Sequence, residues 1–139
     1  MRVEKLVLQA FGPYAGRQTI DFTALGDHRL FLIAGPTGAG KSSILDAICF
    51  ALYGETSGDE RKPPQMRSDH AAPDLPTEVT LDFAVGTERY CILRRPDQSL
   101  VGRGGRPREE KHAATLWRRD PPRPHAQGGG LARRGREGP

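Results

Sequence analysis

The sequence predicts an α/β fold, and three observations in its first part lead to that class. Alternating apolar and polar residues, typical of half-buried strands, occupy residues 17–22 and 77–95. A continuous apolar run at residues 30–34 is typical of a central strand covered on both faces. A glycine-rich turn follows this run and opens onto residues 41–53, whose apolar periodicity is helical. A strand, a glycine turn and a helix in this order indicate an α/β unit.

The other strands are predicted in two pairs. Residues 3–9 supply apolar mass for a first strand, and the turn at 11–16, with two glycines and a proline, joins it to the strand at 17–22. Residues 77–85 and 88–95 alternate on either side of Gly86 and Thr87, which predicts a β-hairpin. We therefore expect a sheet built from two hairpin-like pairs and the central strand.

The predicted helix at 41–53 is apolar around most of its circumference. Only Asp46 interrupts its apolar surface, so we expect the helix to be buried on almost all sides, and Gly54 is well placed to end it. Residues 55–76, with four prolines, read as a long loop. A loop of that length in a small domain is often functional.

Charge and composition divide the chain. Residues 1–96 hold 11 Lys/Arg and 12 Asp/Glu, whereas residues 97–139 hold 10 and 5, so the net charge of +4 belongs to the later part. We predict a folded lobe at 1–96, a basic loop with a possible short strand at 97–119, and a disordered Arg/Gly/Pro-rich tail at 120–139. A basic tail implies only weak, salt-sensitive attraction to polyanions.

The two cysteines and the N-terminus point to a cytoplasmic protein. Cys49 and Cys91 are widely spaced and flanked by apolar residues, so we expect free, buried thiols and no metal site. The first twelve residues mix charged with apolar residues and do not resemble a signal peptide. No apolar run has the length of a membrane span.

The glycine turn matches the phosphate-binding pattern G-x-x-x-x-G-K-[ST]. Its residues are Gly35, Pro36, Thr37, Gly38, Ala39, Gly40, Lys41 and Ser42. The glycines let successive backbone N–H groups converge, and the start of the helix adds unpaired amides and the positive end of its dipole. Lys41 would contact the β- and γ-phosphates, Ser42 would bind Mg²⁺, and Ser43 would donate near the α-phosphate. The fold class is therefore a P-loop NTPase, with ATP and Mg²⁺ as cofactors.

Longer stretches narrow the class. KLVLQAFGPYAGRQTIDF, LFLIAGPTGAGKSSILDAICFALYGETSG and MRSDHA, followed by TEVTLDFAVGTERYCILRR, resemble the SbcC family of bacterial exonuclease subunits. That family belongs to the SMC-like branch of ABC-type ATPases. The resemblance covers residues 2–95 almost continuously, and ATLWRR at 114–119 is also similar to the family.

The resemblance implies the N-terminal lobe of an ATPase head that acts in processing DNA double-strand breaks. The lobe would combine a mixed sheet, one P-loop helix and a β-hairpin. Family partners would be an SbcD-like nuclease subunit, a second SbcC head and double-stranded DNA. The resemblance also places the segment with Arg67 and Asp69 near the nucleotide base, and Gln9 is a weaker candidate.

Other parts of such a head are not recognisable in the sequence. No Walker B Asp-Glu pair, Q-loop, Ser-Gly-Gly signature, heptad run or zinc-apex cysteine pair follows the loop. We therefore expect a truncated product that does not hydrolyse ATP alone, whose last residues resemble a frameshifted reading. Two alternatives stay open: a small stand-alone P-loop kinase or switch, and a non-functional remnant with a basic tail.

Overall fold

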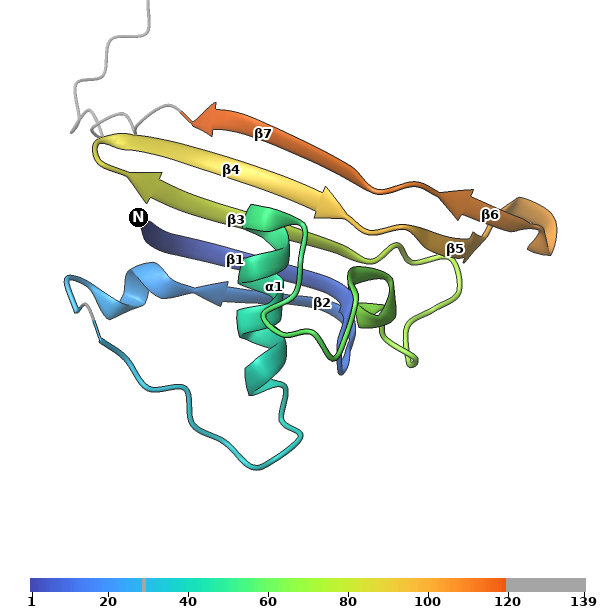
Figure 1. The fold of residues 1–139 in the computed structure, drawn as a ribbon, viewed down its shortest axis with the longest axis horizontal. Helices are drawn as coiled ribbons and strands as arrows, with labels where there is room; N and C mark the ends of the chain where they lie inside the picture. The colour runs from blue at the N-terminus through green and yellow to red at the C-terminus, as the bar shows by residue number, and fades with distance from the viewer. Residues whose placement is uncertain (29, 120–139) are drawn as a thin grey trace, which may run out of the picture.

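In the computed structural model, which describes residues 1–28 and 30–119, five strands form one main sheet (Figure 1). Its strand order is β2-β1-β3-β4-β7, and every neighbouring pair is antiparallel. The strands are β1 Arg2–Phe11, β2 Tyr14–Asp21, β3 Glu78–Val85, β4 Glu88–Arg95 and β7 Ala113–Arg119. Both predicted strand pairs are confirmed, and so is the short strand predicted at 114–119.

A smaller sheet extends from the main one between β4 and β7. It pairs β5 Gln98–Val101 with β6 Pro107–Glu110 (Figure 1). Short 3-10 helices lie at η1 Phe22–Leu25, η2 Pro63–Met66 and η3 Arg103–Gly105. The main sheet includes strands from both sides of residue 96, and the division of the chain at residues 96 and 119 stays a prediction. The predicted tail at 120–139 lies outside the described residues.

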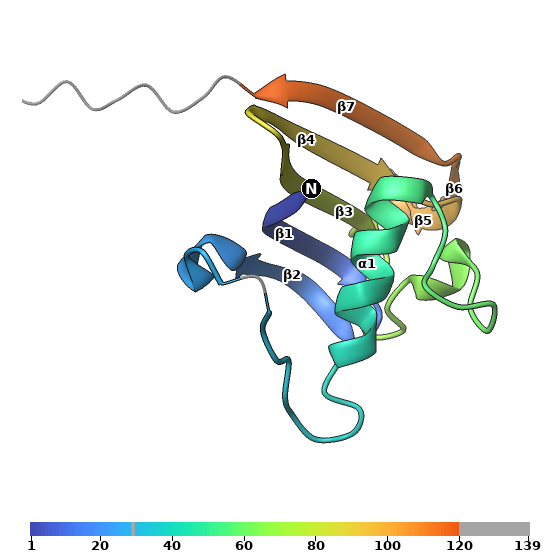
Figure 2. The same ribbon diagram turned by 60° about the vertical axis from the view of Figure 1, so that its left-hand side comes forward.

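One α-helix, α1 Lys41–Tyr53, lies across a single face of the main sheet (Figures 1 and 2). Its bounds and its end at Gly54 agree with the prediction. The apolar side chains buried on its inner face are those of Ile44, Ala47, Phe50 and Ala51. Below them, Leu6, Leu81 and Ile92 are neighbours in register on β1, β3 and β4. Helix and sheet thus bury one shared apolar layer, which is the main stabilising contribution to such a lobe.

The prediction that α1 is buried on almost all sides is wrong. Leu45 is 55% exposed and Tyr53 is 75% exposed, while Cys49 and Leu52 are half-buried. The apolar pattern of a helix shows how much cover it can use, and a single sheet covers only one side. The outer stripe of α1 has no covering element among the described residues.

The prediction of a central strand at residues 30–34 is also wrong. These residues form no strand and run as an extended loop between η1 and α1 (Figure 1). Leu30 is 92% exposed and Leu32 is 88% exposed, although Phe31 packs its ring 5.6 Å from that of Phe22. A buried strand needs neighbours for its backbone N–H and C=O groups, and no described strand pairs with this run.

The sheet face away from α1 is charged. Three buried carboxylates on this face are paired with arginines of adjacent elements: Glu4 with Arg89, Glu78 with Arg95, and Asp82 with Arg119. The Arg119–Asp82 pair, at 2.6 Å, links β7 to β3 across β4. In the part of the chain that the structure describes, no helix is long and apolar enough to span a bilayer.

Candidate functional site

A cleft of about 870 Å³ lies at the N-terminal end of α1. Its walls are the glycine turn, the β1–β2 turn, residues 56–61, and the pair Asp69 and His70. The predicted site residues that line it are Thr37, Gly38, Gly40, Lys41, Ser42, Ser43 and Asp69. The glycine motif and one acidic residue from a distant segment therefore meet in one cavity.

The backbone of the glycine turn adopts the conformation that its sequence predicts. Gly38 and Gly40 have positive φ angles of 84° and 92°, a region that side chains rarely allow. The N–H of Ala39 donates to the carbonyl of Pro36 at 3.1 Å, which closes the turn. Helix α1 starts at Lys41 without a side-chain cap, so the donors of its first turn remain available at the positive end of the helix dipole.

Lys41 is folded back over the turn. Its ammonium donates to the carbonyl oxygen of Pro36 at 2.9 Å and also to that of Gly35. Gly35, Pro36 and Ala39 are exposed residues of the same turn that do not line the cleft themselves. The geometry holds one positive charge directly above the converging loop, where an anion would meet it.

The two serines after the lysine differ in exposure. Ser42 is exposed and lines the cleft, so its hydroxyl is accessible from the cavity. Ser43 is only 7% exposed and lies against Gly12, where a Cβ would come within 2.7 Å of the serine Oγ. Ser43 thus joins the motif to the β1–β2 turn, and this explains why a glycine is needed at position 12.

The β1–β2 turn forms a wall that the sequence did not predict. Gly12 and Pro13 line the cleft, and the hydroxyl of Tyr14 donates to the carbonyl of Gly40 at 3.3 Å. The N–H of Gly12 donates to the carbonyl of Met66 at 2.6 Å, which holds the turn against η2. The Gly-Pro pair in the sequence signalled a turn, but no pattern signalled which segment it would contact.

Residues 56–61 are held against α1 by Asp46. The carboxylate of Asp46 accepts from the backbone N–H of Ser57 at 2.9 Å and from the Ser57 hydroxyl. Thr56 donates within the same segment to Gly58 at 3.1 Å. The polar residue that interrupts the apolar helix surface therefore anchors part of the long loop, and Asp59 and Glu60 from that loop face the cavity.

The weaker sequence candidates are placed differently from one another. Asp69 is exposed and lines the cleft. Arg67 does not line it: its guanidinium donates to the carbonyls of Leu75 at 2.6 Å and Ala72 at 3.1 Å, and to the Thr77 hydroxyl at 3.1 Å. Gln9 also lies outside the lining, with its amide donating to the Pro76 carbonyl at 3.0 Å. Within residues 1–28 and 30–119, no three His, Cys, Asp or Glu side chains form a potential metal cluster.

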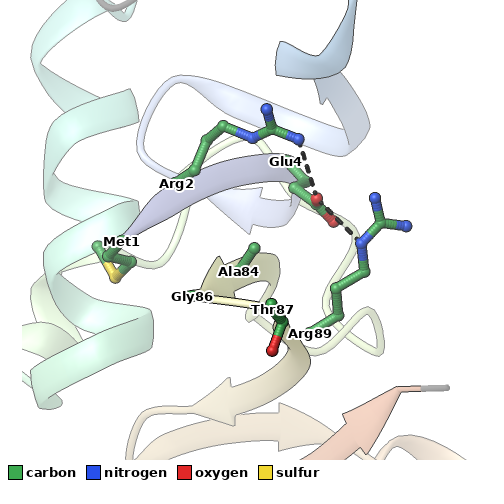
Figure 3. Close-up of a pocket in the computed structure, with 7 residues that line it drawn as sticks. All are labelled: Met1, Arg2, Glu4, Ala84, Gly86, Thr87 and Arg89. Atoms are coloured by element: carbon green, nitrogen blue, oxygen red, sulfur yellow. Dashed lines mark ion pairs between the residues drawn. The ribbon is translucent and has the colours of Figure 1, made fainter. Parts of the chain in front are cut away.

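A second hollow lies at the opposite end of β1. It has a volume of about 660 Å³ and contains none of the predicted site residues. Figure 3 shows Glu4 between two guanidinium groups, with Arg2 at 3.5 Å and Arg89 at 3.3 Å. These ion pairs account for the burial of Glu4, because a buried carboxylate needs opposite charge nearby.

Comparison with known proteins places this arrangement in a family. A sequence profile described as an AAA domain matches residues 5–102, which is more than half of the chain and includes the glycine turn, α1 and the central strands. The chain belongs to the AAA domain family. The fold class predicted from the glycine motif is thereby confirmed.

Relatives of this AAA-domain chain carry one shared name. The chain is 61% identical over 117 residues to the SbcC component of the nuclease SbcCD from Vibrio cholerae, a match that covers 84% of this chain. It is 42% identical over 95 residues to the protein of that name in Treponema pallidum, and 44% identical over 100 residues to that in Lactococcus lactis. These matches cover 68% and 72% of the chain. The resemblance to the SbcC family is confirmed.

The matched region is a small part of those relatives. The AAA-domain chain spans 12% of the length of the Vibrio cholerae protein and 9% of the other two. The similarity therefore concerns the segment that holds the glycine motif and the first strands.

Proposed function

We propose that the cleft at the start of α1 binds the polyphosphate of ATP together with Mg²⁺. The observation that carries this proposal is the meeting of three features in one cavity: the left-handed glycines of residues 35–40, the uncapped start of α1, and the Lys41 ammonium. Together they supply backbone donors, a helix dipole and a formal positive charge for an anion.

The residues present fit a triphosphate and its metal. A Cβ at Gly40 would lie 2.8 Å from the ring of Tyr14, so the backbone can adopt this close packing only with glycine. Magnesium prefers oxygen ligands and, when bound, would neutralise part of the phosphate charge. The exposed Ser42 hydroxyl is the ligand that the chain offers for it.

Each further residue has a defined part in this proposal. Lys41 exchanges its bonds with loop carbonyls for bonds with phosphate oxygens, and Ser43 donates near the α-phosphate. Asp69 lies where the nucleoside would extend from the loop, while Arg67 acts behind it as a support of the 66–70 segment. We propose Gly35, Pro36, Thr37, Gly38, Ala39, Gly40, Lys41, Ser42, Ser43 and Asp69 as the nucleotide site.

At the level of the cell, we propose that the chain supplies the ATP-binding lobe of an SbcC-like ATPase in the cytoplasm. The names of its relatives support this role, which would couple nucleotide binding to a nuclease acting on DNA double-strand breaks. The partners would be an SbcD-like nuclease subunit, a second head and double-stranded DNA. We expect no ATP turnover by this chain alone, because hydrolysis also requires a residue that positions water and a second carboxylate on the metal.

The proposal is tested by calorimetric titration of Mg-ATP into the Lys41→Ala variant. Removal of the ammonium is expected to weaken binding at least a hundredfold, because a charge-assisted contact to the phosphates is lost from a site organised around it. Lys111→Ala, which removes an exposed lysine far along the chain, is the matched control and is expected to bind as the unaltered chain does.

Equal binding by Lys41→Ala and Lys111→Ala would overturn the proposal. Release of inorganic phosphate by the purified chain would instead favour a stand-alone kinase or switch, because the SbcC-like lobe is expected to bind without turnover.

A further inference from the structure

We infer that Tyr14 is a positioning residue for the phosphate loop, acting through the Gly40–Lys41 peptide. The inference rests on the proposed nucleotide site and adds to it a residue outside the glycine motif. Tyr14 lies at the start of β2, 26 positions before Gly40, and it is not one of the residues lining the cleft. Its contribution therefore has to be transmitted through the backbone that it contacts.

The first step is the hydrogen bond from the phenol. The Tyr14 hydroxyl donates to the carbonyl oxygen of Gly40 at 3.3 Å, and the same oxygen accepts the backbone N–H of Ile44 at 3.3 Å. One carbonyl is thus held by two donors, one from the sheet and one from the helix. The ring of Tyr14 packs against the apolar core, so the hydroxyl has little freedom to leave.

The second step follows from the planarity of the peptide bond. The carbonyl of Gly40 and the N–H of Lys41 belong to one trans peptide, in which the two groups point in opposite directions. Fixing the carbonyl toward Tyr14 and the helix fixes the N–H of Lys41 away from them. That direction leads out of the N-terminal end of α1, where the cleft lies. Tyr14 thereby aims a donor that a phosphate would use.

The third step is steric. A Cβ built on Gly40 would lie 2.8 Å from Cζ of Tyr14 and 3.0 Å from Cγ of Pro13, so both residues form a wall directly behind the loop. The wall is itself anchored, because the N–H of Gly12 donates to the carbonyl of Met66 at 2.6 Å. A loop backed in this way is preorganised for its ligand and loses less conformational entropy on binding.

The variant Tyr14→Phe tests the inference, because it removes only the hydroxyl and keeps the ring. We expect the affinity for Mg-ATP to fall about three- to tenfold, the effect of one neutral hydrogen bond. Magnesium tripolyphosphate, which has no base, is expected to lose affinity by the same factor. Tyr53→Phe is the matched control, since Tyr53 is 75% exposed at the other end of α1.

A measurement without ligand separates this inference from the proposed function. In the ¹H–¹⁵N spectrum of folded protein, the Lys41 amide resonance is expected to move in Tyr14→Phe and to stay in place in Tyr53→Phe. Thermal unfolding of both variants is expected to match that of the unaltered chain within a few degrees, so that a change in affinity is not a loss of fold.

Three results would overturn the inference. The first is unchanged affinity for both ligands in Tyr14→Phe. The second is loss of ATP affinity with tripolyphosphate affinity retained, which would indicate contact with the base. The third is an unmoved Lys41 resonance. If the unaltered chain binds neither ligand while the Lys41 resonance still moves, the proposed function fails but the positioning of the peptide stands.

Discussion

The guanidinium of Arg67 supports the segment that carries Asp69. It donates to the carbonyls of Ala72 and Leu75 and to the hydroxyl of Thr77, so it ties one wall of the cleft to the start of β3. Thr77 in turn donates to the carbonyl of Ala10 at 2.9 Å. The side chain therefore connects three backbone segments that are distant in sequence.

We expect Arg67→Ala to lower the free energy of unfolding by about 1–3 kcal/mol, because it removes charge-assisted hydrogen bonds and leaves their acceptors without a donor. Urea denaturation followed by circular dichroism measures this change. Arg103→Ala, at an exposed arginine of η3, is expected to change stability by less than about 0.5 kcal/mol. Equal stability of the two variants would show that the Arg67 network contributes nothing.

At this scale the sequence predicted residue types more reliably than their contacts. The motif from Gly35 to Ser42 could be recognised because each position has a backbone or charge requirement that is written in the sequence. The direction of Arg67 could not be predicted, since it depends on where the carbonyls of residues 72 and 75 fall in three dimensions. Tyr14 was missed for the same reason.

At the scale of elements, residues 30–34 and the outer stripe of α1 leave apolar surface exposed. Leu30, Leu32 and Leu45 are each more than half exposed. Exposed apolar patches of this kind bind other apolar surfaces or promote aggregation. The segment that precedes the phosphate loop is therefore the most adhesive part of the described chain.

We expect Leu32→Ser to reduce binding of the dye ANS and to reduce self-association in light scattering, while changing the free energy of unfolding by less than about 0.5 kcal/mol. Leu6→Ala, at a fully buried core residue, is the contrasting variant and is expected to destabilise the protein by about 2–5 kcal/mol. A comparable loss of stability in Leu32→Ser would show that this residue is packed in solution.

Element types were predicted well where the pattern was local. The hairpin of β3 and β4 follows from alternation around Gly86 and Thr87, and α1 follows from its period and its terminal glycine. The run at 30–34 was predicted as a strand because its composition suits one. Composition, however, does not reveal whether neighbouring strands exist to pair with it.

At the scale of the whole molecule, the stability of the sheet depends on a buried row that crosses it. Cys91 on β4 is 5% exposed and is in register with Asp82 on β3 and Trp117 on β7. Burial, with a smaller contribution from Asp82, raises the pKa of the Cys91 thiol from 9.0 to about 12. The folded protein therefore holds this proton more tightly than the unfolded chain does.

The sign of the resulting pH dependence follows from linkage. Between pH 9 and about pH 12 the unfolded chain loses the thiol proton while the folded chain keeps it, so rising pH favours unfolding. We expect the free energy of unfolding, measured by urea denaturation in reducing buffer, to fall more steeply from about pH 8 to about pH 10.5 in the unaltered protein than in Cys91→Ala. Parallel pH profiles for the two proteins would contradict this account.

The overall architecture was predicted in part. The α/β class and the phosphate loop could be derived from residues that are adjacent in the sequence. The return of β7 to the edge of β4, and the single-sided cover of α1, depend on long-range pairing that no local pattern encodes. The walls of the cleft belong to this second group, since they bring together residues 12–13, 56–61 and 69–70.

The central claim is that the amides of residues 35–43, with the Lys41 ammonium, bind a nucleotide polyphosphate. A calorimetric titration of ATP into the folded chain, in magnesium and again in EDTA, tests it most directly. The account predicts one binding site per chain that requires magnesium and is lost in Lys41→Ala. Folded protein that shows no magnesium-dependent affinity for ATP, or an affinity that survives Lys41→Ala, would contradict it.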